Sequence, residues 1–210
     1  MTEALKKKLE PYFLQRLKKT EFGEKDLPTK EEICIFVGLS KWQRELYSEY
    51  TKNGFDAEQH GSPLAAISWL KMLCGHPLLV TKSQDRSDLL EESAKLQVLW
   101  SLLLRLQRSN HRTLVFSQST KMLDIIERVL DGEDIIKICR IDGSTAQGDR
   151  QKIVDSFNDI ESDVDVLLLS TKACGVGLTL TGADRAILFD PSWNPSDDSQ
   201  VCTICSLPDC

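Results

Sequence analysis

The spacing of the hydrophobic positions changes near residue 94 and divides the chain in two. Before that point apolar residues recur every three or four positions, which is typical of helices that bury one face. The spacing predicts a helix over 42–50 with Ser40 as its N-cap. A second helix is predicted to open at Pro63 and to end at Gly75. The short apolar run from Ile33 to Val37 is predicted to be a strand.

After residue 94, short and almost fully apolar runs alternate with amphipathic stretches. The predicted strands cover 113–116, 135–141, 164–169 and 185–189, and the predicted helices cover 95–107, 121–130 and 147–157. Strands that are apolar along their whole length are typical of parallel sheets with both faces covered. The sequence therefore predicts an α/β fold, a parallel sheet with helices on both faces, preceded by a small helical region.

Length and charge limit the possible functions. A chain of 210 residues with 41% hydrophobic content can build one medium α/β domain and a smaller appendage. No apolar run of about 18 residues occurs, and the first residues lack the apolar core of a secretory signal, so the expected compartment is the cytosol or nucleus. The net charge of −6 argues against a free-standing nucleic-acid binder, so any DNA contact must come from local sites.

The seven cysteines allow two interpretations. Those at positions 34, 74, 139 and 174 stand singly in apolar or motif contexts, as reduced core cysteines do, with disulfides as the alternative. Cys202, Cys205 and Cys210 are spaced like three zinc ligands, but no fourth ligand lies nearby, and no metal site is expected. A divergent, disordered end of a truncated product is the preferred interpretation of this segment.

Small and polar residues follow each predicted strand. These segments are 117–119, 142–145 with Arg150 one helical turn later, 170–177 and 190–195. Because the carboxyl ends of parallel strands meet at one edge of the sheet, the segments should lie together. Hydroxyl groups and the free N–H groups at helix starts bind phosphate oxygens well, so the edge is predicted to follow a nucleic-acid strand.

Two alternatives remain open from the residues alone. Ser144 and Thr145 could simply be N-caps of the helix that begins near Gln147. Trp193 could be an ordinary core aromatic. Gly175 and Gly177 would let the backbone approach a ribose or phosphate closely, although two glycines spaced in this way are weak evidence.

The same loops carry a family resemblance. HRTLVFSQSTKMLDIIERVL, CRIDGSTAQGDRQKIVDSFN and VLLLSTKACGVGLTLTGADRAILFDPSWNPSDDSQ resemble helicase motifs IV to V and the following tryptophan segment of Swi/Snf-like superfamily 2 ATPases. Upstream, PYFLQRLKK, LPTKEEICIFVGLSKWQRELY and LKMLCGHPLLV resemble the family's link between lobes and its lobe-2 protrusion. The resemblance covers roughly residues 10 to 200. Within the family, the motif sequences look closest to those of the excision-repair-6-like branch.

The resemblance implies a RecA-like helicase C-terminal lobe preceded by a helical protrusion. It divides the chain into a link from a missing first lobe (1–30), the protrusion (31–93), the lobe (94–200) and a divergent tail (201–210). It implies DNA-backbone contacts for Ser117, Gln118, Gly143, Ser144, Thr145, Arg150, Ser170, Thr171 and Lys172. It further implies nucleotide contacts for Gly175 and Gly177 and a coupling role for Trp193 and Asn194.

Three positions depart from the family pattern. Lys172 stands where arginine is usual, Cys174 where glycine is usual and Thr179 where asparagine is usual. Lysine keeps the charge of arginine but loses its bidentate fork, so a phosphate contact at Lys172 should be weakened rather than abolished.

The family pattern is also incomplete. The chain has no GxxxxGK[ST] loop and no acidic Mg²⁺ site, and no arginine follows Arg185. We therefore expect a fragment that is inactive alone, taken from a nuclear translocase that uses ATP with Mg²⁺ on double-stranded DNA together with an N-terminal ATPase lobe. The alternatives are a non-catalytic interaction module with partner surfaces around Tyr47 and Leu70, an inert truncated isoform, and a helicase-like ATPase acting on RNA.

Overall fold

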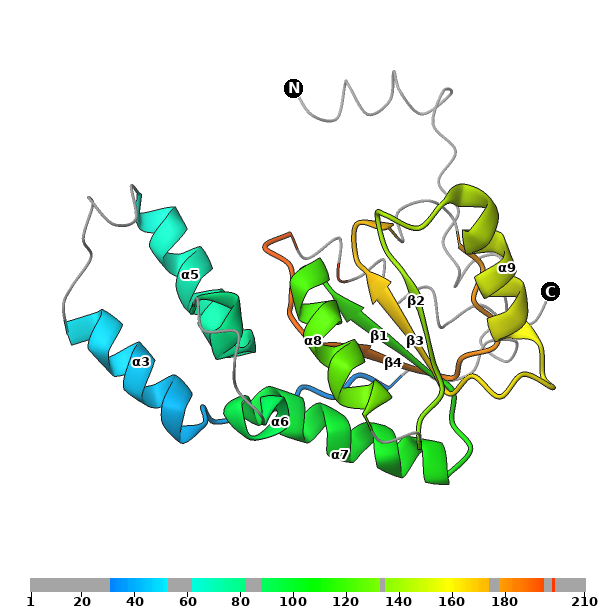
Figure 1. Cartoon of the computed structure of the whole chain (residues 1–210), viewed down its shortest axis with the longest axis horizontal. Coiled ribbons are helices and arrows are strands. Elements are labelled where there is room, and N and C mark those ends of the chain that lie inside the picture. Colours follow the sequence, from blue (N-terminus) through cyan, green and yellow to red (C-terminus); the bar gives the residue numbers. More distant parts are fainter. Residues whose placement is uncertain are drawn as a thin grey trace, which may run out of the picture. The chain divides into compact units, whose positions relative to one another are not determined.

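The computed structural model describes residues 31–52, 62–81, 88–132, 135–173 and 178–194, together with Asp198. The elements in chain order are α3 (Lys41–Lys52), α5 (Pro63–Gly75), the 3-10 turn η2 (Pro77–Leu79), α6 (Leu89–Glu92), α7 (Ala94–Arg108), β1 (Thr113–Ser117), α8 (Thr120–Asp131), β2 (Ile138–Ile141), α9 (Gln147–Asn158), β3 (Val166–Ser170) and β4 (Arg185–Leu188) (Figure 1). The predicted link over 1–30 and the predicted tail over 201–210 lie outside the described residues.

The described strands form one parallel sheet in the order β2-β3-β1-β4. Its centre is β1 and β3, in which every residue is buried, and Ser117 at the end of β1 pairs with Ser170 at the end of β3. Central strands that are buried along their whole length fit a sheet that is covered on both faces. The carboxyl ends of the strands therefore lie side by side at one edge.

Helices cover both faces of this sheet (Figure 1). On one face Leu99 of α7 and Ile126 of α8 pack with Val115 and Leu168 of the strands. On the other face Phe157 of α9 packs with the strand residues that point the opposite way, among them Leu114, Phe116, Leu167 and Leu169. The predicted α/β fold, a parallel sheet with helices on both faces, is confirmed.

The helices before the sheet are fixed by one buried amide. The Nε2 atom of Gln43, in α3, donates to the carbonyls of Leu73 (2.9 Å) and Cys74 (3.2 Å) at the end of α5. The same side chain accepts N–H bonds from Ser40 (3.0 Å) and Ala94 (3.4 Å). The Ser40 hydroxyl accepts the Gln43 N–H at 3.1 Å, which confirms the predicted N-cap of α3.

The predicted strand from Ile33 to Val37 is wrong. The stretch adopts no strand conformation, and no strand of the described sheet pairs with it. Its apolar side chains are exposed, 75% for Ile33 and 94% for Phe36. Apolar, β-branched residues form a strand only where a neighbouring strand accepts their backbone hydrogen bonds.

Smaller differences concern one strand start and the cysteines. The second strand begins at Ile138 rather than Ile135, because the N–H of the preceding Lys137 donates to the Asp165 side chain at 2.9 Å instead of to a carbonyl of the neighbouring strand. Cys34, Cys74 and Cys139 are free, as predicted, but Cys34 is exposed rather than in a core. Cys174 and the three terminal cysteines lie outside the described residues.

Among the described helices, none combines the length and the apolar character that crossing a membrane requires.

Candidate functional site

The loops after β1, β3 and β4 are joined by hydrogen bonds at the carboxyl edge of the sheet. The Ser117 carbonyl accepts both the N–H and the hydroxyl of Thr171, each at 3.1 Å. The Asp190 carboxylate accepts the Gln118 N–H at 2.9 Å and the Ser117 hydroxyl at 3.1 Å. Residues that follow three different strands therefore form one connected unit, as the sequence predicts for the edge of a parallel sheet.

Asp190 is the acceptor at the centre of this unit. Burial raises the pKa of its carboxyl group, while the Gln118 N–H, the Ser117 hydroxyl and the positive charges of Lys71 and Lys95 act in the opposite direction. Asp190 therefore shapes the loops through these hydrogen bonds and leaves any phosphate contact to the side chains around it.

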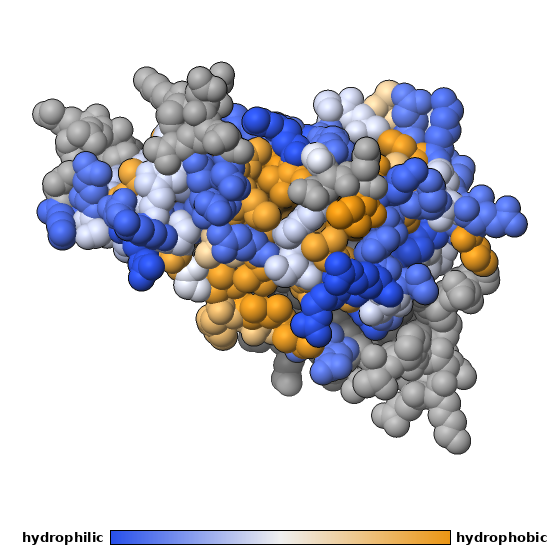
Figure 2. All heavy atoms as spheres, turned by 60° about the horizontal axis from the view of Figure 1, so that its bottom comes forward, coloured by the Kyte–Doolittle hydropathy of each residue, from blue (hydrophilic) through white to orange (hydrophobic). Residues whose placement is uncertain are grey.

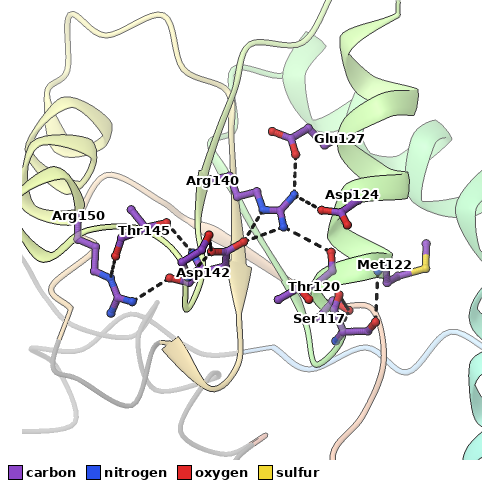
Figure 3. A network of polar contacts seen from close by, with 11 residues as sticks. Ser117, Thr120, Met122, Asp124, Glu127, Arg140, Asp142, Thr145 and Arg150 are labelled. Carbon is purple, nitrogen blue, oxygen red and sulfur yellow. Dashed lines mark hydrogen bonds and ion pairs between the residues drawn. The ribbon is translucent and has the colours of Figure 1, made fainter. Parts of the chain in front are cut away.

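The loop after β2 closes on itself (Figure 3). The Asp142 carboxylate accepts the Ser144 N–H at 2.8 Å and the Ser144 hydroxyl at 2.6 Å, and the Asp142 N–H donates to the Thr145 hydroxyl at 3.1 Å. Ser144 and Thr145 do not cap α9, whose N-cap is Ala146 without a side-chain bond. The capping alternative is therefore wrong, and both hydroxyl groups belong to the turn itself.

Arg140 fastens this turn to helix α8 (Figure 3). From β2, its guanidinium binds Asp142 at 2.7 Å and reaches Asp124 and Glu127 of α8, each at 2.6 Å. The hydrogen bonds from Ser144, followed by those from Arg140, lower the pKa of Asp142 to about 2, against the effect of burial. The carboxylate that orders the turn is thus ionised across the physiological range.

Arg150 holds the same turn from the other side (Figure 3). Its Nε donates to the Thr145 carbonyl at 2.9 Å and its Nη2 donates to the Asp142 carbonyl at 2.8 Å. A guanidinium carries five N–H groups, so these bonds use only part of its capacity. Arg150 is half-exposed at the start of α9, where it can also donate to an anion.

The predicted contact residues differ in their exposure. Ser117 and Ser170 are buried, and Ser117 uses its hydroxyl within the loop unit. Gln118, Thr145, Arg150 and Thr171 are half-buried, and Gly143, Ser144 and Lys172 are exposed. The structure therefore separates buried supporting hydroxyls from an exposed polar edge. Gly175 and Gly177 lie outside the described residues.

Trp193 is 62% exposed, so it is not a core aromatic and that alternative is wrong. The ammonium nitrogen of Lys71 lies 5.4 Å from the centre of its ring. The next residue, Asn194, donates its N–H to the Ser192 hydroxyl at 3.1 Å, within a turn whose Ser192 N–H binds Asp198 at 2.9 Å. The two predicted coupling residues thus lie in a hydrogen-bonded stretch of the chain, with the Trp193 ring exposed.

Two residues that support the edge were not predicted from the sequence: Lys71 joins the loops after β1 and β4 to α5, and Arg140 joins the turn after β2 to α8. Asp190 lies in the predicted segment 190–195, but its bonds to the loop after β1 were not predicted. In the described part of the chain, no group of three His, Cys, Asp or Glu residues could hold a metal ion.

Comparison with known families matches both halves of the chain. Residues 94–203 match the family described as helicase conserved C-terminal domain. Residues 1–109 match the SNF2-related domain.

Individual relatives agree with these matches. DNA repair and recombination protein RAD26 of Saccharomyces cerevisiae is 38% identical over 94% of this chain and 19% of its own length. DNA excision repair protein ERCC-6-like of Mus musculus is 34% identical over 96% of this chain and 21% of its own length. The chain thus spans about a fifth of the length of these curated relatives. The Sulfolobus solfataricus SWI2/SNF2 ATPase core in complex with dsDNA is 25% identical, with a TM-score of 0.70 over 95% of this chain and 43% of that one.

Proposed function

Because the chain belongs to the SNF2-related ATPase family and carries its helicase C-terminal region, we propose that it is the second motor lobe of an ATP-dependent double-stranded DNA translocase. The translocase acts in DNA repair, chromosome segregation or chromatin remodelling, the first and last of which are named among relatives such as RAD26 and Chromatin Remodeling 24. The lobe's task is to hold the backbone of the duplex while ATP is turned over between two lobes.

The observation that supports this proposal most is the polar edge itself. Hydrogen bonds around Ser117, Asp142 and Asp190 hold three loops and a turn at the carboxyl ends of parallel strands, where ligands of such sheets bind. The similar Sulfolobus core was solved with double-stranded DNA. Hydroxyl, amide and cationic groups such as these are the ones that hydrogen-bond to backbone phosphates in protein–DNA complexes.

The proposed DNA contacts are the residues predicted from the family pattern. Half-buried or exposed groups are presented by Gln118, Gly143, Ser144, Thr145, Arg150, Thr171 and Lys172, whereas Ser117 and Ser170 are buried at the ends of β1 and β3. Lys172 carries the positive charge of the third loop. Contacts of this kind fix the position of the protein on the duplex and read no sequence.

The nucleotide part of the proposal needs a second lobe. Gly175 and Gly177 are proposed to face ATP across the cleft, and Trp193 and Asn194 to couple nucleotide state to DNA grip. The sequence has no GxxxxGK[ST] loop, and in the described part of the chain no group of three His, Cys, Asp or Glu residues could hold a metal ion. No hydrolytic step is therefore assigned to this chain alone.

Further assignments follow from the family pattern. We propose the divisions 1–30, 31–93, 94–200 and 201–210 as link, protrusion, lobe and tail, and the nucleus as the location. The excision-repair-6-like branch is supported by the wording of the motifs and by the mouse relative. RAD26 is similar to a comparable degree, so the assignment to this branch depends mainly on the amino-acid sequences of the motifs.

An interaction module is the second candidate, because apolar side chains remain exposed on the helices before the sheet. Leu64 and Ile67 of α5 are 65% and 47% exposed, and Tyr47 of α3 is partly exposed. Figure 2 shows a further stretch of hydrophobic surface across the middle of the face that lies at the bottom of Figure 1, on the side of α6 and α7. Exposed apolar patches of this kind often bind proteins.

A chimeric enzyme tests the proposed function. The chain is completed with the remaining parts of the ATPase region of a family member, and ATP hydrolysis is measured without nucleic acid, with duplex DNA and with duplex RNA. The proposal predicts stimulation by duplex DNA. Stimulation by RNA alone would favour an RNA-dependent ATPase, and a folded chimera without any stimulated hydrolysis would favour the interaction module.

A further inference from the structure

Lys71 bridges the helices before the sheet and the polar edge of the sheet. Its ammonium group donates to the Pro191 carbonyl at 2.6 Å and to the Gln118 side-chain oxygen at 3.3 Å. It also lies 5.4 Å from the centre of the Trp193 ring. One side chain of α5 thus contacts the loops after β1 and β4, which are 47 and 120 positions away in the chain.

The helix that carries Lys71 is held rigidly near this residue. The next turn of α5 contains Leu73, which is fully buried, and its carbonyl is bound by Gln43. The Ser93 hydroxyl donates to the Gly75 carbonyl at 2.6 Å and caps α7 through the Leu96 N–H. A lysine on an element fixed at its end can position whatever its ammonium group binds.

The charged group of Lys71 makes its contacts within the protein. An ammonium group has three N–H donors, and here it contacts a carbonyl, an amide oxygen and an aromatic face at once. Its side chain is half-buried, whereas Lys172 on the same edge is exposed. Lys71 is thus arranged to act on the loops, and Lys172 to act on an anion from outside.

We propose that Lys71 is a positioning residue, which holds the Gln118 side chain and the Trp193 turn in one fixed arrangement and thereby maintains the DNA-backbone contacts of the loop after β1. This inference rests on the proposed function for its DNA part. Asp190 joins the same two loops through the Gln118 N–H, so loss of Lys71 leaves them folded but free to shift. Arginine can replace Lys71, because a guanidinium also binds carbonyls and stacks on aromatic rings.

The first test follows Trp193 in the free protein. The full chain is labelled with fluorotryptophan, and its ¹⁹F NMR resonance for Trp193 is assigned with Trp193→Phe. Lys71→Met is expected to move and broaden that resonance, Lys71→Arg to restore a single sharp line, and Lys137→Met to leave it unchanged. Lys137 is the control because it is an exposed lysine paired with Asp163 and precedes β2, at the other end of the sheet. An unmoved resonance in a folded Lys71→Met chain would overturn the proposal.

The second test measures duplex DNA binding over a series of salt concentrations. A positioning residue predicts that Lys71→Met weakens binding about fivefold, the equivalent of one hydrogen bond, and leaves the salt dependence of the binding constant unchanged. A salt slope lowered by about one would make Lys71 a direct phosphate contact instead and overturn the positioning role, as would unchanged affinity. If the unaltered chain does not bind duplex DNA at all, the proposed function fails, and the Trp193 resonance still decides whether Lys71 positions the turn.

Discussion

The Asp190 carboxylate accepts the backbone N–H of Gln118 at 2.9 Å, across 72 positions of the chain. Its second oxygen accepts the Ser117 hydroxyl at 3.1 Å. These two bonds join the loop after β4 to the loop after β1, and the Ser117 carbonyl extends the connection to Thr171 after β3. The polar edge is therefore organised before any ligand arrives, which limits the ordering that DNA binding would require.

Replacing Asp190 should destabilise the fold. Asp190→Ala leaves the Gln118 N–H and the Ser117 hydroxyl without their acceptor in a buried place, at a cost of about 2 kcal/mol. Asp190→Asn keeps one oxygen acceptor and should cost less than half of that. Urea unfolding followed by circular dichroism measures both. An Asp190→Ala variant as stable as wild type would show that the carboxylate does not hold the loops.

Asp142 should make stability depend on pH at the acid end. Its pKa is lowered to about 2, so the native state favours the ionised form more than the unfolded chain does. The resulting stabilisation is complete above the ordinary pKa of an aspartate, about 4, and is lost as the pH falls toward 2. In urea unfolding, the free energy of unfolding of wild type should exceed that of Asp142→Asn at pH 7, and this difference should shrink steadily below pH 4. A difference that stays constant down to pH 2.5 would contradict this.

The buried Gln43 amide should contribute more to the free energy of unfolding than the amide of an exposed glutamine. Gln43→Ala leaves the carbonyls of Leu73 and Cys74 and two N–H groups without this partner, and we expect a loss of about 3 kcal/mol. Gln97 is the matched control, since its amide makes one exposed bond to the Glu91 carbonyl at 3.1 Å. Gln97→Ala should change the unfolding free energy by less than about 0.5 kcal/mol. Similar effects of the two substitutions would refute the central place of Gln43.

Two glycines should respond to alanine in opposite directions. A Cβ at Gly182 would lie 2.5 Å from the Phe157 carbonyl oxygen and 3.0 Å from the Asn158 Cα, so backbone must move. A Cβ at Gly148, in α9, would meet nothing within 4 Å. Gly182→Ala should destabilise by about 1–3 kcal/mol, and Gly148→Ala should stabilise by up to about 1 kcal/mol, because alanine favours helix. Thermal unfolding of both variants checks the pair, and a neutral Gly182→Ala would contradict the close approach.

Most of the fold could be predicted because burial leaves a periodic trace in the sequence. The strands around Val115 and Leu168 are mostly apolar because helices cover both faces, and α8 presents Leu123, Ile126 and Leu130 at helical spacing. The run at Ile33 was misjudged because its residues favour a strand locally, while a strand also needs a neighbour that the local sequence does not reveal.

The candidate site could be predicted only in outline. Its loops follow from the rule that parallel strands end at one edge, but their supports are contacts between distant residues. Lys71 reaches Pro191 across 120 positions, and Arg140 reaches Asp124 from another element. No local pattern marks such pairs. The hydroxyls of Ser144 and Thr145 matched a helix cap equally well, and only the geometry assigned them to the turn.

The proposed DNA grip is tested most directly by the affinity of the chain for duplex DNA, measured by fluorescence anisotropy at about 50 to 200 mM salt. Lys172→Gln is compared with Lys137→Gln, a control with the same charge change at the other end of the sheet. If the polar edge binds backbone phosphates, the logarithm of the binding constant falls linearly with the logarithm of the salt concentration. Lys172→Gln should lower this slope by about one, and Lys137→Gln should leave it unchanged. No binding at the lowest salt, or equal effects of the two substitutions, would contradict it.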